Sequence, residues 1–272
     1  MQEGLMADYA ITVGNVEMLA LTDGQGDMQP LDVFRASTLE QWQSEYPDLL
    51  DGELIHPRFG TTAVRSGGKL IVVDTGLNAP GCTLMSDMRE KGIDPAAVDL
   101  VVLTHLHPDH IGWNLTDGKP TFPNARYIAT QADWDYWTSP EVIDSAEHIK
   151  EQALPLKDLN VIDLIGSDDY SITDELTAVG TPGHTPGHIS IVISSGSERA
   201  YILGDVAHSP AQAHYTDWSP VFDVDPEVSR RTRHTVMDML ESEGTLVSAG
   251  HFPGNGFGHF VHEGGRRVWQ GI

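Results

Sequence analysis

Four side chains that commonly bind metal ions lie within the segment THLHPDH, residues 104–110. They are His105, His107, Asp109 and His110. Neutral imidazole and carboxylate groups suit a borderline divalent ion such as zinc, with manganese, iron, cobalt or nickel as alternatives. The segment follows the apolar run VDLVVL, which predicts a buried strand, and a loop at the end of a strand holds side chains steadily at the edge of a sheet. The pattern therefore predicts a metal site.

Three further candidate ligands also stand where an apolar, strand-like run ends. His184 follows LTAVG in the turn TPGHTPGH, Asp205 ends the run YILGD, and His251 follows LVSAG. A single histidine or aspartate in such a place is usually a hydrogen-bonded structural residue. Seven side chains of ligand type in one shared context favour a common metal site over that alternative.

The elements that must bring these side chains together are two groups of strands, each followed by helices. Gly67 and Gly68 predict a hairpin between two of the strands, and Asp225 with Pro226 predicts the start of a long helix. Apolar patterns predict strands at residues 11–21, 61–66, 69–76, 98–105, 125–130, 160–165, 175–181, 188–194, 199–205 and 245–250. They predict helices at residues 83–91, 131–137, 141–152 and 226–243. Two sheets packed face to face with helices outside would bury the apolar faces.

Composition limits the function classes that need consideration. The chain has 272 residues and a formal net charge of -24, from 40 acidic and 16 basic residues. Because anionic phosphates would be repelled, we expect neither a nucleic-acid partner nor a membrane-surface partner. Cys82 is the only cysteine, which excludes an internal disulfide and a cysteine-based metal cage. With no export signal and no long apolar run, we expect a soluble, cytoplasmic protein with one domain at residues 1–272.

The order and spacing of THLHPDH, TPGHTPGH, GD and GH resemble the metallo-β-lactamase fold superfamily. The resemblance covers residues 60–255 and implies an α/β fold, a four-layered αβ/βα sandwich of two mixed β-sheets with helices outside. It also implies two divalent metal ions. The family pattern, carried over to this sequence, places one ion on His105, His107 and His184, the second on Asp109, His110 and His251, and Asp205 between the two.

The resemblance further implies hydrolytic chemistry. Two neighbouring ions can share a water molecule, lower its pKa, and polarise a carbonyl or phosphoryl oxygen beside them. A hydroxide that bridges the ions would then attack the substrate, so the reaction needs no serine or cysteine nucleophile. Asp109 is the candidate for transferring a proton to the leaving oxygen.

Within the superfamily the chain is most similar to the lactonase and esterase branch, which includes methyl-parathion-hydrolase-like enzymes and acyl-homoserine lactonases. The segments FPNARYIATQADWDYW, GDVAHSPAQ and GHFPGNGFGHF carry this similarity. It implies a small lactone or carboxylic ester as substrate, with phosphotriesters as a side activity. His208 stands where many acyl-homoserine lactonases have a tyrosine, so it is a candidate to contact the substrate oxygen or to orient Asp205. The alternative is a histidine that only packs beside its strand.

Two other activities of the same fold stay open as alternatives. One is a mononuclear iron dioxygenase acting on a sulfur compound, and the other is a glyoxalase II-like thioesterase. Metal content and oxygen consumption separate the dioxygenase from a hydrolase. A true β-lactamase is disfavoured, because those enzymes generally lack the bridging aspartate that Asp205 supplies here.

Residues 20–60 have weak periodicity and carry Phe34, Trp42, Tyr46 and Phe59 among prolines and acids. We expect this segment to be a lid or an oligomer arm. Homodimers are frequent in the lactonase and esterase branch, so if the segment is an oligomer arm we expect it to form a homodimer contact.

Overall fold

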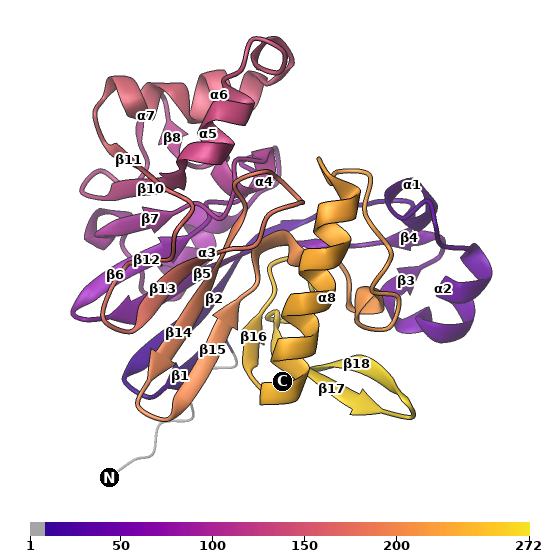
Figure 1. Cartoon of the computed structure of the whole chain (residues 1–272). Helices are drawn as coiled ribbons and strands as arrows, with labels where there is room; N and C mark the ends of the chain where they lie inside the picture. Colours follow the sequence, from indigo (N-terminus) through magenta and orange to yellow (C-terminus); the bar gives the residue numbers. More distant parts are fainter. Residues whose placement is uncertain (1–8) are drawn as a thin grey trace.

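Two seven-stranded β-sheets packed face to face form the centre of the protein (Figure 1). The computed structural model describes residues 9–272, so most of the N-terminal segment in which we find no export signal lies outside the described residues. The first sheet has the strand order β1 (Ala10–Val13), β2 (Val16–Gln25), β5 (Arg58–Ser66), β6 (Lys69–Val73), β7 (Leu100–Val102), β10 (Arg126–Thr130) and β11 (Ile162–Ile165). The second sheet has the order β12 (Tyr170–Ser171), β13 (Leu176–Gly180), β14 (Ile189–Ser195), β15 (Glu198–Ile202), β16 (Leu246–Ser248), β17 (Phe257–Glu263) and β18 (Arg266–Gly271).

Helices cover the outer faces of both sheets, so the fold has four layers. The outer face of the first sheet packs against α3 (Leu84–Glu90), α5 (Gln131–Trp137), α6 (Glu147–Gln152) and α7 (Leu154–Asp158). The outer face of the second sheet packs against α8 (Pro226–Glu243), which crosses the front of the molecule in Figure 1. Among residues 9–272, none of the helices has both the length and the apolar character that crossing a membrane requires. The predicted four-layered sandwich is confirmed.

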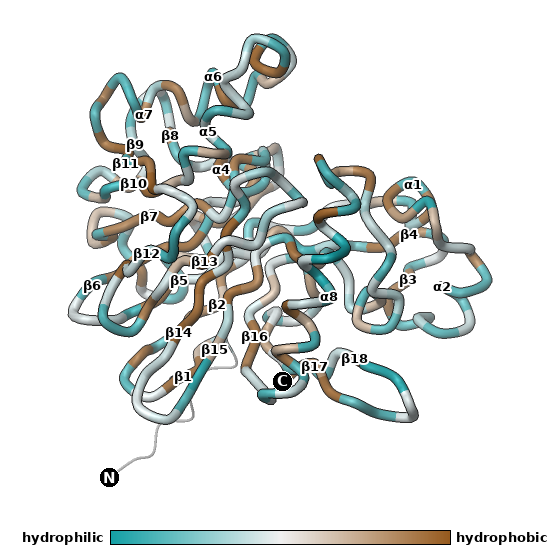
Figure 2. Tube along the Cα trace, viewed as in Figure 1, coloured by the Kyte–Doolittle hydropathy of each residue, from teal (hydrophilic) through white to brown (hydrophobic). Residues whose placement is uncertain are grey.

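The inner faces of the two sheets share one apolar core. Val73 and Val102 from the first sheet and Ile191 and Ile202 from the second belong to a single cluster of buried side chains. Figure 2 shows that hydrophobic residues concentrate along the strands, whereas the connecting loops are largely hydrophilic. Removing this apolar surface from water is the main force that holds the sheets together.

The directions of the strands explain why the candidate ligands meet. Strands β6, β7, β10 and β11 are mutually parallel in the first sheet, and β15 is parallel to β16 in the second. The carboxyl ends of parallel strands open at one edge of a sheet, where loops carry functional side chains. His105 follows β7, Asp205 follows β15, and His251 follows β16. The two edges face one another, and the site lies between them.

The long helix α8 begins and ends where its sequence predicts. The Asp225 carboxylate accepts hydrogen bonds from the backbone amides of Glu227 and Val228, and Pro226 occupies the first turn. These contacts satisfy amide groups that have no partner within the helix. Gly244 ends the helix with a left-handed φ of 63°, a conformation that glycine adopts without steric cost.

Three sequence expectations differ from the structure. Residues 11–21 are not one strand, because Gly14 turns the chain with φ 58° and makes β1 and β2 a hairpin. The helix expected at residues 141–152 is broken at Ala146, whose φ of -103° and ψ of 67° are not helical. The glycine-rich end of the chain forms the strand pair β17 and β18, which the sequence analysis does not predict.

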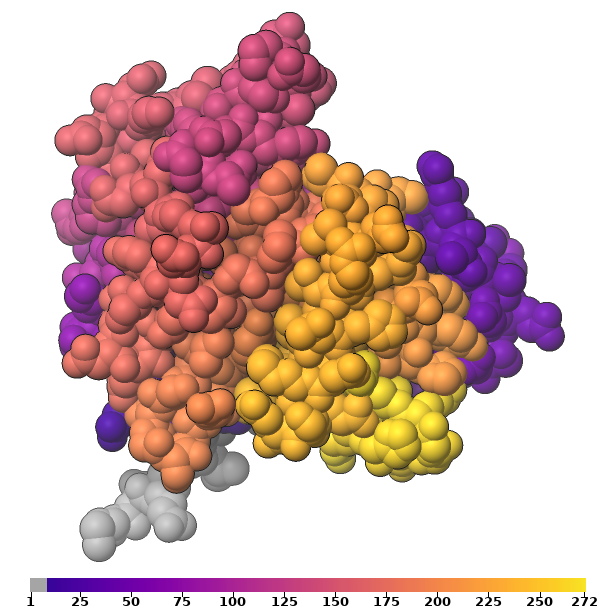
Figure 3. Space-filling model, in the orientation of Figure 1, coloured from indigo at the N-terminus to yellow at the C-terminus, as the bar shows by residue number. Residues whose placement is uncertain are grey.

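Residues 26–57, which we call the arm, leave the first sheet between β2 and β5. They contain α1 (Pro30–Val33), α2 (Leu39–Glu45) and a small sheet of β3 (Leu50–Asp51) and β4 (Leu54–Ile55). Residues 20–25 and 58–60 of the segment expected as a lid or oligomer arm are instead strand residues of β2 and β5. In Figure 3 the arm lies at the edge of the molecule, beside the chain that follows β15. Trp42, fully buried, packs there against Trp218 with ring centroids 5.4 Å apart.

Candidate metal centre

The structure brings all seven predicted ligand side chains to the same edge of the sandwich. They form two groups whose ligand atoms lie within 4.8 Å of one another, and a third group adds His208. The first group is His105, His107, His184 and Asp205; the second is Asp109, His110 and His251; the third is Asp205, His208 and His251. None of the predicted ligands lies apart from the others, and the grouping matches the one that the resemblance implies.

In the first group, ring nitrogens from three histidines converge on one point. His107 Nδ1 lies 3.0 Å from His105 Nε2 and 2.8 Å from His184 Nε2. Two ring nitrogens at such a distance form a hydrogen bond only if one of them carries a proton and the other accepts it. Three nitrogens that all face one another cannot all pair in this way. The arrangement instead aims nitrogen lone pairs at a common position, as the ligands of a cation do.

Asp205 lies at the centre of the whole cluster. Its Oδ2 is 3.1 Å from the Nε2 atoms of both His208 and His251. Its Oδ1 is 3.3 Å from His110 Nε2. Oδ2 is also 3.2 Å from His184 Nε2, so the carboxylate faces the first group through Oδ2 and the second group through both oxygens.

The backbone before Asp205 is fixed by a tight contact with another histidine. Gly204 has φ 58°, and a Cβ atom added there would lie 2.5 Å from His188 Nε2. The same His188 nitrogen accepts a hydrogen bond of 2.8 Å from the amide of Asp205. Burial lowers the pKa of His188 to about 3, so its ring stays neutral and can accept this bond. His188 is thus a structural residue that fixes the backbone at Asp205.

Each of four histidines in the cluster has a partner on its outer nitrogen. His110 Nδ1 lies 2.8 Å from Asp74 Oδ2, and His184 Nδ1 lies 2.9 Å from Asp223 Oδ1. The Nδ1 atoms of His105 and His251 pair with the Thr104 hydroxyl and the carbonyl oxygen of Arg58. A hydrogen bond at Nδ1 fixes the ring and leaves Nε2 free to face the centre.

Sequence reasoning missed the two carboxylates behind these rings. Asp74 follows the apolar strand β6 in the segment VVDTG, the same strand-end context as the predicted ligands, so a signal was present. Its φ of 64° is unusual for a residue other than glycine. Asp223 stands in a loop without periodicity, and no sequence signal marks it.

A third carboxylate, also missed, joins the two loops that carry the histidines. Asp133 in α5 accepts hydrogen bonds from the backbone amide of Leu106 at 3.0 Å and from that of Gly187 at 2.6 Å. Its Oδ2 also accepts a bond of 2.9 Å from the Thr185 hydroxyl. Burial raises the pKa of Asp133, and these donors act against that shift. The links hold the loops of His107 and His184 at a fixed distance.

The charges in the cluster favour a cation. Burial and the neighbouring histidines hold the pKa values of His105 and His107 well below the usual range. Burial acts in the same direction on His184, but the carboxylates of Asp205 and Asp223 outweigh it and raise its pKa to about 9. Asp205 outweighs burial in the same way at His251. The rings of His105 and His107 are therefore poor proton acceptors, whereas the carboxylates beside His184 and His251 favour positive charge at the cluster.

Buried ligand atoms that lack a good hydrogen bond are a further sign that the cluster fits divalent ions. Among the described residues, His110 Nε2 and Asp205 Oδ1 are buried and make no well-aligned hydrogen bond, although they lie 3.3 Å apart. A buried polar atom with no partner costs free energy unless a ligand satisfies it. Histidine nitrogens and carboxylate oxygens, with no thiolate, suit zinc and the other divalent transition ions.

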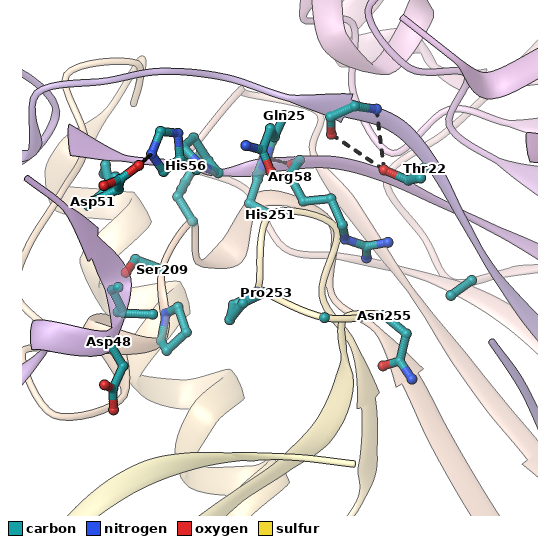
Figure 4. A pocket seen from close by; sticks show the side chains of 18 of the residues that line it. Thr22, Gln25, Asp48, Asp51, His56, Arg58, Ser209, His251, Pro253 and Asn255 are labelled. Atoms are coloured by element: carbon teal, nitrogen blue, oxygen red, sulfur yellow. Dashed lines mark hydrogen bonds and ion pairs between the residues drawn. The ribbon is translucent and has the colours of Figure 1, made fainter. Parts of the chain in front are cut away.

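A pocket of about 390 Å³ opens over this cluster. Its floor includes His107, Asp109, Asp205 and His208, while Met28, Val33, Phe34 and Ile55 of the arm, together with Phe59 and Phe222, form apolar walls. Pockets of this size that combine apolar walls with a few convergent polar groups commonly bind small molecules. A second cavity of about 1100 Å³ shares His208 and His251 with the pocket; Figure 4 shows it beside His56, Arg58 and His251.

Comparisons with known proteins agree with this architecture. The model of the metallo-beta-lactamase superfamily matches residues 61–251. The N-acyl homoserine lactonase AttM of Azorhizobium caulinodans is 30% identical over 178 residues, which cover 64% of this chain and 64% of that protein. An N-acyl homoserine lactonase of Bacillus thuringiensis is 23% identical over 168 residues, 62% of this chain and 61% of that protein. The matched part is thus less than two thirds of the length of these relatives.

Solved structures resemble the chain over nearly its whole length. A crystal structure described as hydrolase AbOPH in the beta-lactamase superfamily has a TM-score of 0.88 and 26% sequence identity, and covers 97% of both chains. AidC, described as a dizinc quorum-quenching lactonase in complex with a product, has a TM-score of 0.87 and 21% identity, and covers 98% of this chain and 99% of its own. Because the family model matches most of the sequence and the fold agrees, the chain belongs to the metallo-beta-lactamase superfamily.

Proposed function

We propose that the protein is a metal-dependent hydrolase that opens lactones bearing an apolar substituent. The observation that carries the proposal is the convergence of seven histidine and aspartate side chains, five of which line an apolar pocket. In this proposal the first ion is held by His105, His107 and His184, the second by Asp109, His110 and His251, with Asp205 shared between them. The matched N-acyl homoserine lactonases support the lactone as substrate.

Two bound divalent ions would supply a water molecule of lowered pKa and polarise the carbonyl oxygen of the substrate. The chain's own residues would then bind the substrate and carry the proton that the water gives up to the leaving oxygen. The Asp109 side chain is about 22% exposed and lines the pocket, so it can reach the leaving oxygen and return a proton to it. The apolar walls hold the substituent and keep bulk water away from the reacting ester bond.

Zinc is the metal we propose, because the donor set suits it and the structurally similar AidC is described as a dizinc enzyme. Carboxylic esters and phosphotriesters are further candidate substrates, since polarised carbonyl and phosphoryl oxygens react by the same chemistry. No specific observation in residues 9–272 favours the iron dioxygenase or the thioesterase.

The decisive experiment combines metal analysis with a hydrolysis panel. Purified protein is expected to contain about two divalent ions per chain, and to hydrolyse N-acyl homoserine lactones faster than aryl esters or phosphotriesters without consuming oxygen. Removing the metal with a chelator should abolish turnover, and adding zinc should restore it. His262→Ala, which changes an exposed histidine outside the cluster, serves as the control and should behave as the wild type. One iron per chain with oxygen uptake would instead support the dioxygenase.

His208 is proposed to contact the substrate. It lines the pocket, lies 3.1 Å from Asp205, and has a buried Nδ1 atom without a hydrogen-bond partner in residues 9–272. Burial lowers its pKa to about 4, so the ring is neutral and can donate one hydrogen bond. His208→Ala should therefore lower kcat/KM for a lactone by about tenfold or more, since it removes a donor near the developing oxyanion. A change below about twofold, with metal content intact, would remove His208 from the mechanism.

A further inference from the structure

Arg233 is a charged side chain buried completely in the middle of α8. A guanidinium removed from water must find partners for its donors, or its burial costs several kcal/mol. It donates hydrogen bonds to the carbonyl oxygens of Val206, Thr216 and Trp218, to the Ser229 hydroxyl, and to the carboxylate of Asp223. The proposed mechanism uses neither Arg233 nor Asp223.

Asp223 joins this arginine to the metal cluster. Its Oδ2 lies 3.2 Å from Arg233 Nη2, and its Oδ1 lies 2.9 Å from His184 Nδ1. The side chains of all three residues are almost fully buried. A continuous chain of contacts therefore runs from the centre of α8 to a ring at the floor of the pocket.

The direction of the hydrogen bond decides which nitrogen of His184 is free. A carboxylate only accepts, so the bond to Asp223 requires the proton of His184 to be on Nδ1. The other nitrogen, Nε2, then faces the point that it shares with His107 Nδ1, 2.8 Å away, and is the atom that would give its lone pair to an ion there. Carboxylates that bond the outer nitrogen of a metal-binding histidine fix its tautomer and increase its basicity.

Each half of the cluster has a carboxylate behind one of its histidines, and the two halves differ in which groups hold that carboxylate in place. Behind His110, the carboxylate of Asp74 accepts from the backbone amide and the hydroxyl of Thr104, both at 2.7 Å. Behind His184, the carboxylate of Asp223 is held by a guanidinium. Arg233 thus fixes the orientation of Asp223 through a directed ion pair, and the helix that carries Arg233 lies outside the second sheet.

We propose that Asp223 and Arg233 are positioning residues that set the affinity of the His105, His107 and His184 half for its metal ion. This inference rests on the proposed function, since it assumes that the cluster binds metal. Arg233 also ties the chain that follows β15 to α8. A test must therefore distinguish an effect on metal affinity from a general loss of stability.

Asp223→Asn is the first variant to measure, by equilibrium dialysis of zinc against the metal-free protein. We expect one of the two equivalents to bind about 10- to 100-fold more weakly, as for other partners of metal-binding histidines. In a His184→Ala background the same substitution should cause no further loss, because the ring through which Asp223 acts is absent. Asp217→Asn is the matched control, because it removes a carboxylate 2.9 Å from His234 on the exposed surface.

Arg233→Lys and Arg233→Met provide a second measurement that does not depend on turnover. The absorption spectrum of the cobalt-substituted protein reports the ligand geometry at each ion. We expect the spectrum to change in Arg233→Met and to be partly restored in Arg233→Lys, which keeps the charge but loses the planar fork. Thermal unfolding of each metal-free variant shows whether it still folds.

Equal zinc affinity in Asp223→Asn and the wild type would overturn the inference. So would a loss of zinc affinity on Asp223→Asn that is equally large in the wild type and in the His184→Ala background. Either result leaves the proposed function intact, provided that the wild type binds two ions and hydrolyses lactones. A wild type that binds no divalent ion would overturn both. If Arg233 variants do not fold, the Asp223 cycle alone decides between the outcomes.

Discussion

Asp205→Asn is expected to lose at least one metal equivalent and to lower kcat/KM for lactones by more than about 100-fold. A loss of about 100-fold is the most that removing a hydrogen-bond partner of a metal ligand usually causes, and Asp205 is proposed as a ligand itself. The carboxylate reaches His110 through one oxygen and His208 and His251 through the other. An amide offers one oxygen instead of two and carries no charge. Metal analysis of the purified variant and steady-state kinetics at saturating zinc measure the two effects.

The control for this prediction is Asp163→Asn, which removes an exposed carboxylate that pairs with Arg126 on the surface. Surface changes of this kind usually alter the free energy of unfolding by no more than about 0.5 kcal/mol. The control should keep full metal content and full activity. Wild-type kinetics in Asp205→Asn would contradict the proposed bridging role directly.

Trp42→Ala is expected to loosen the arm and, with it, one wall of the pocket. The Trp42 ring is fully buried, lies 5.8 Å from the Phe34 ring and 5.4 Å from the Trp218 ring, and donates a hydrogen bond of 2.9 Å to Ser37. Losing a buried tryptophan typically lowers the free energy of unfolding by about 3–5 kcal/mol. Urea unfolding followed by fluorescence and circular dichroism measures this loss.

The same variant should raise KM for lactones with long apolar substituents more than it lowers kcat. The reason is that Phe34, which packs on Trp42, lines the pocket, whereas the metal cluster lies on the two sheets. Leu31→Ala provides the control within the arm, because Leu31 is 40% exposed and its removal should change the stability by less than about 0.5 kcal/mol. Equal loss of kcat across short and long substrates would argue against the arm as a substrate wall.

The strands and the positions of the candidate ligands could be predicted because both leave local patterns, whereas the four-layered arrangement comes from the family resemblance. Apolar runs such as VDLVVL mark buried strands, and ligand-type residues placed directly after such runs are brought to one sheet edge by parallel strand direction. The helix that starts at Asp225 carries its own start signals, and the structure confirms them. These features depend on neighbours in the chain, so a single sequence contains them.

Other features depend on contacts between distant segments and leave no local pattern. Asp223 approaches His184 across 39 positions in the chain, and only the packed structure brings them together. The arm has weak periodicity because its aromatic side chains pack against Trp218 and Tyr215, from a loop that precedes α8. The end of the chain was not expected to be β17 and β18 because its glycines hide the alternation, although Trp269 packs on Phe252 there with ring centroids 4.8 Å apart.

The division of the candidate ligands between the two sheets links ion binding to folding. The first sheet supplies the side chains of residues 105–110, and the second supplies His184, Asp205 and His251. An ion bound by ligands from both sheets would cross-link the two sheets, because the sheets could separate on unfolding only if the ion were released. At a free concentration of about 1,000 times Kd, such an ion adds about 4 kcal/mol to the free energy of unfolding. Metal supply would then govern how long the protein persists in the cell as well as how fast it works.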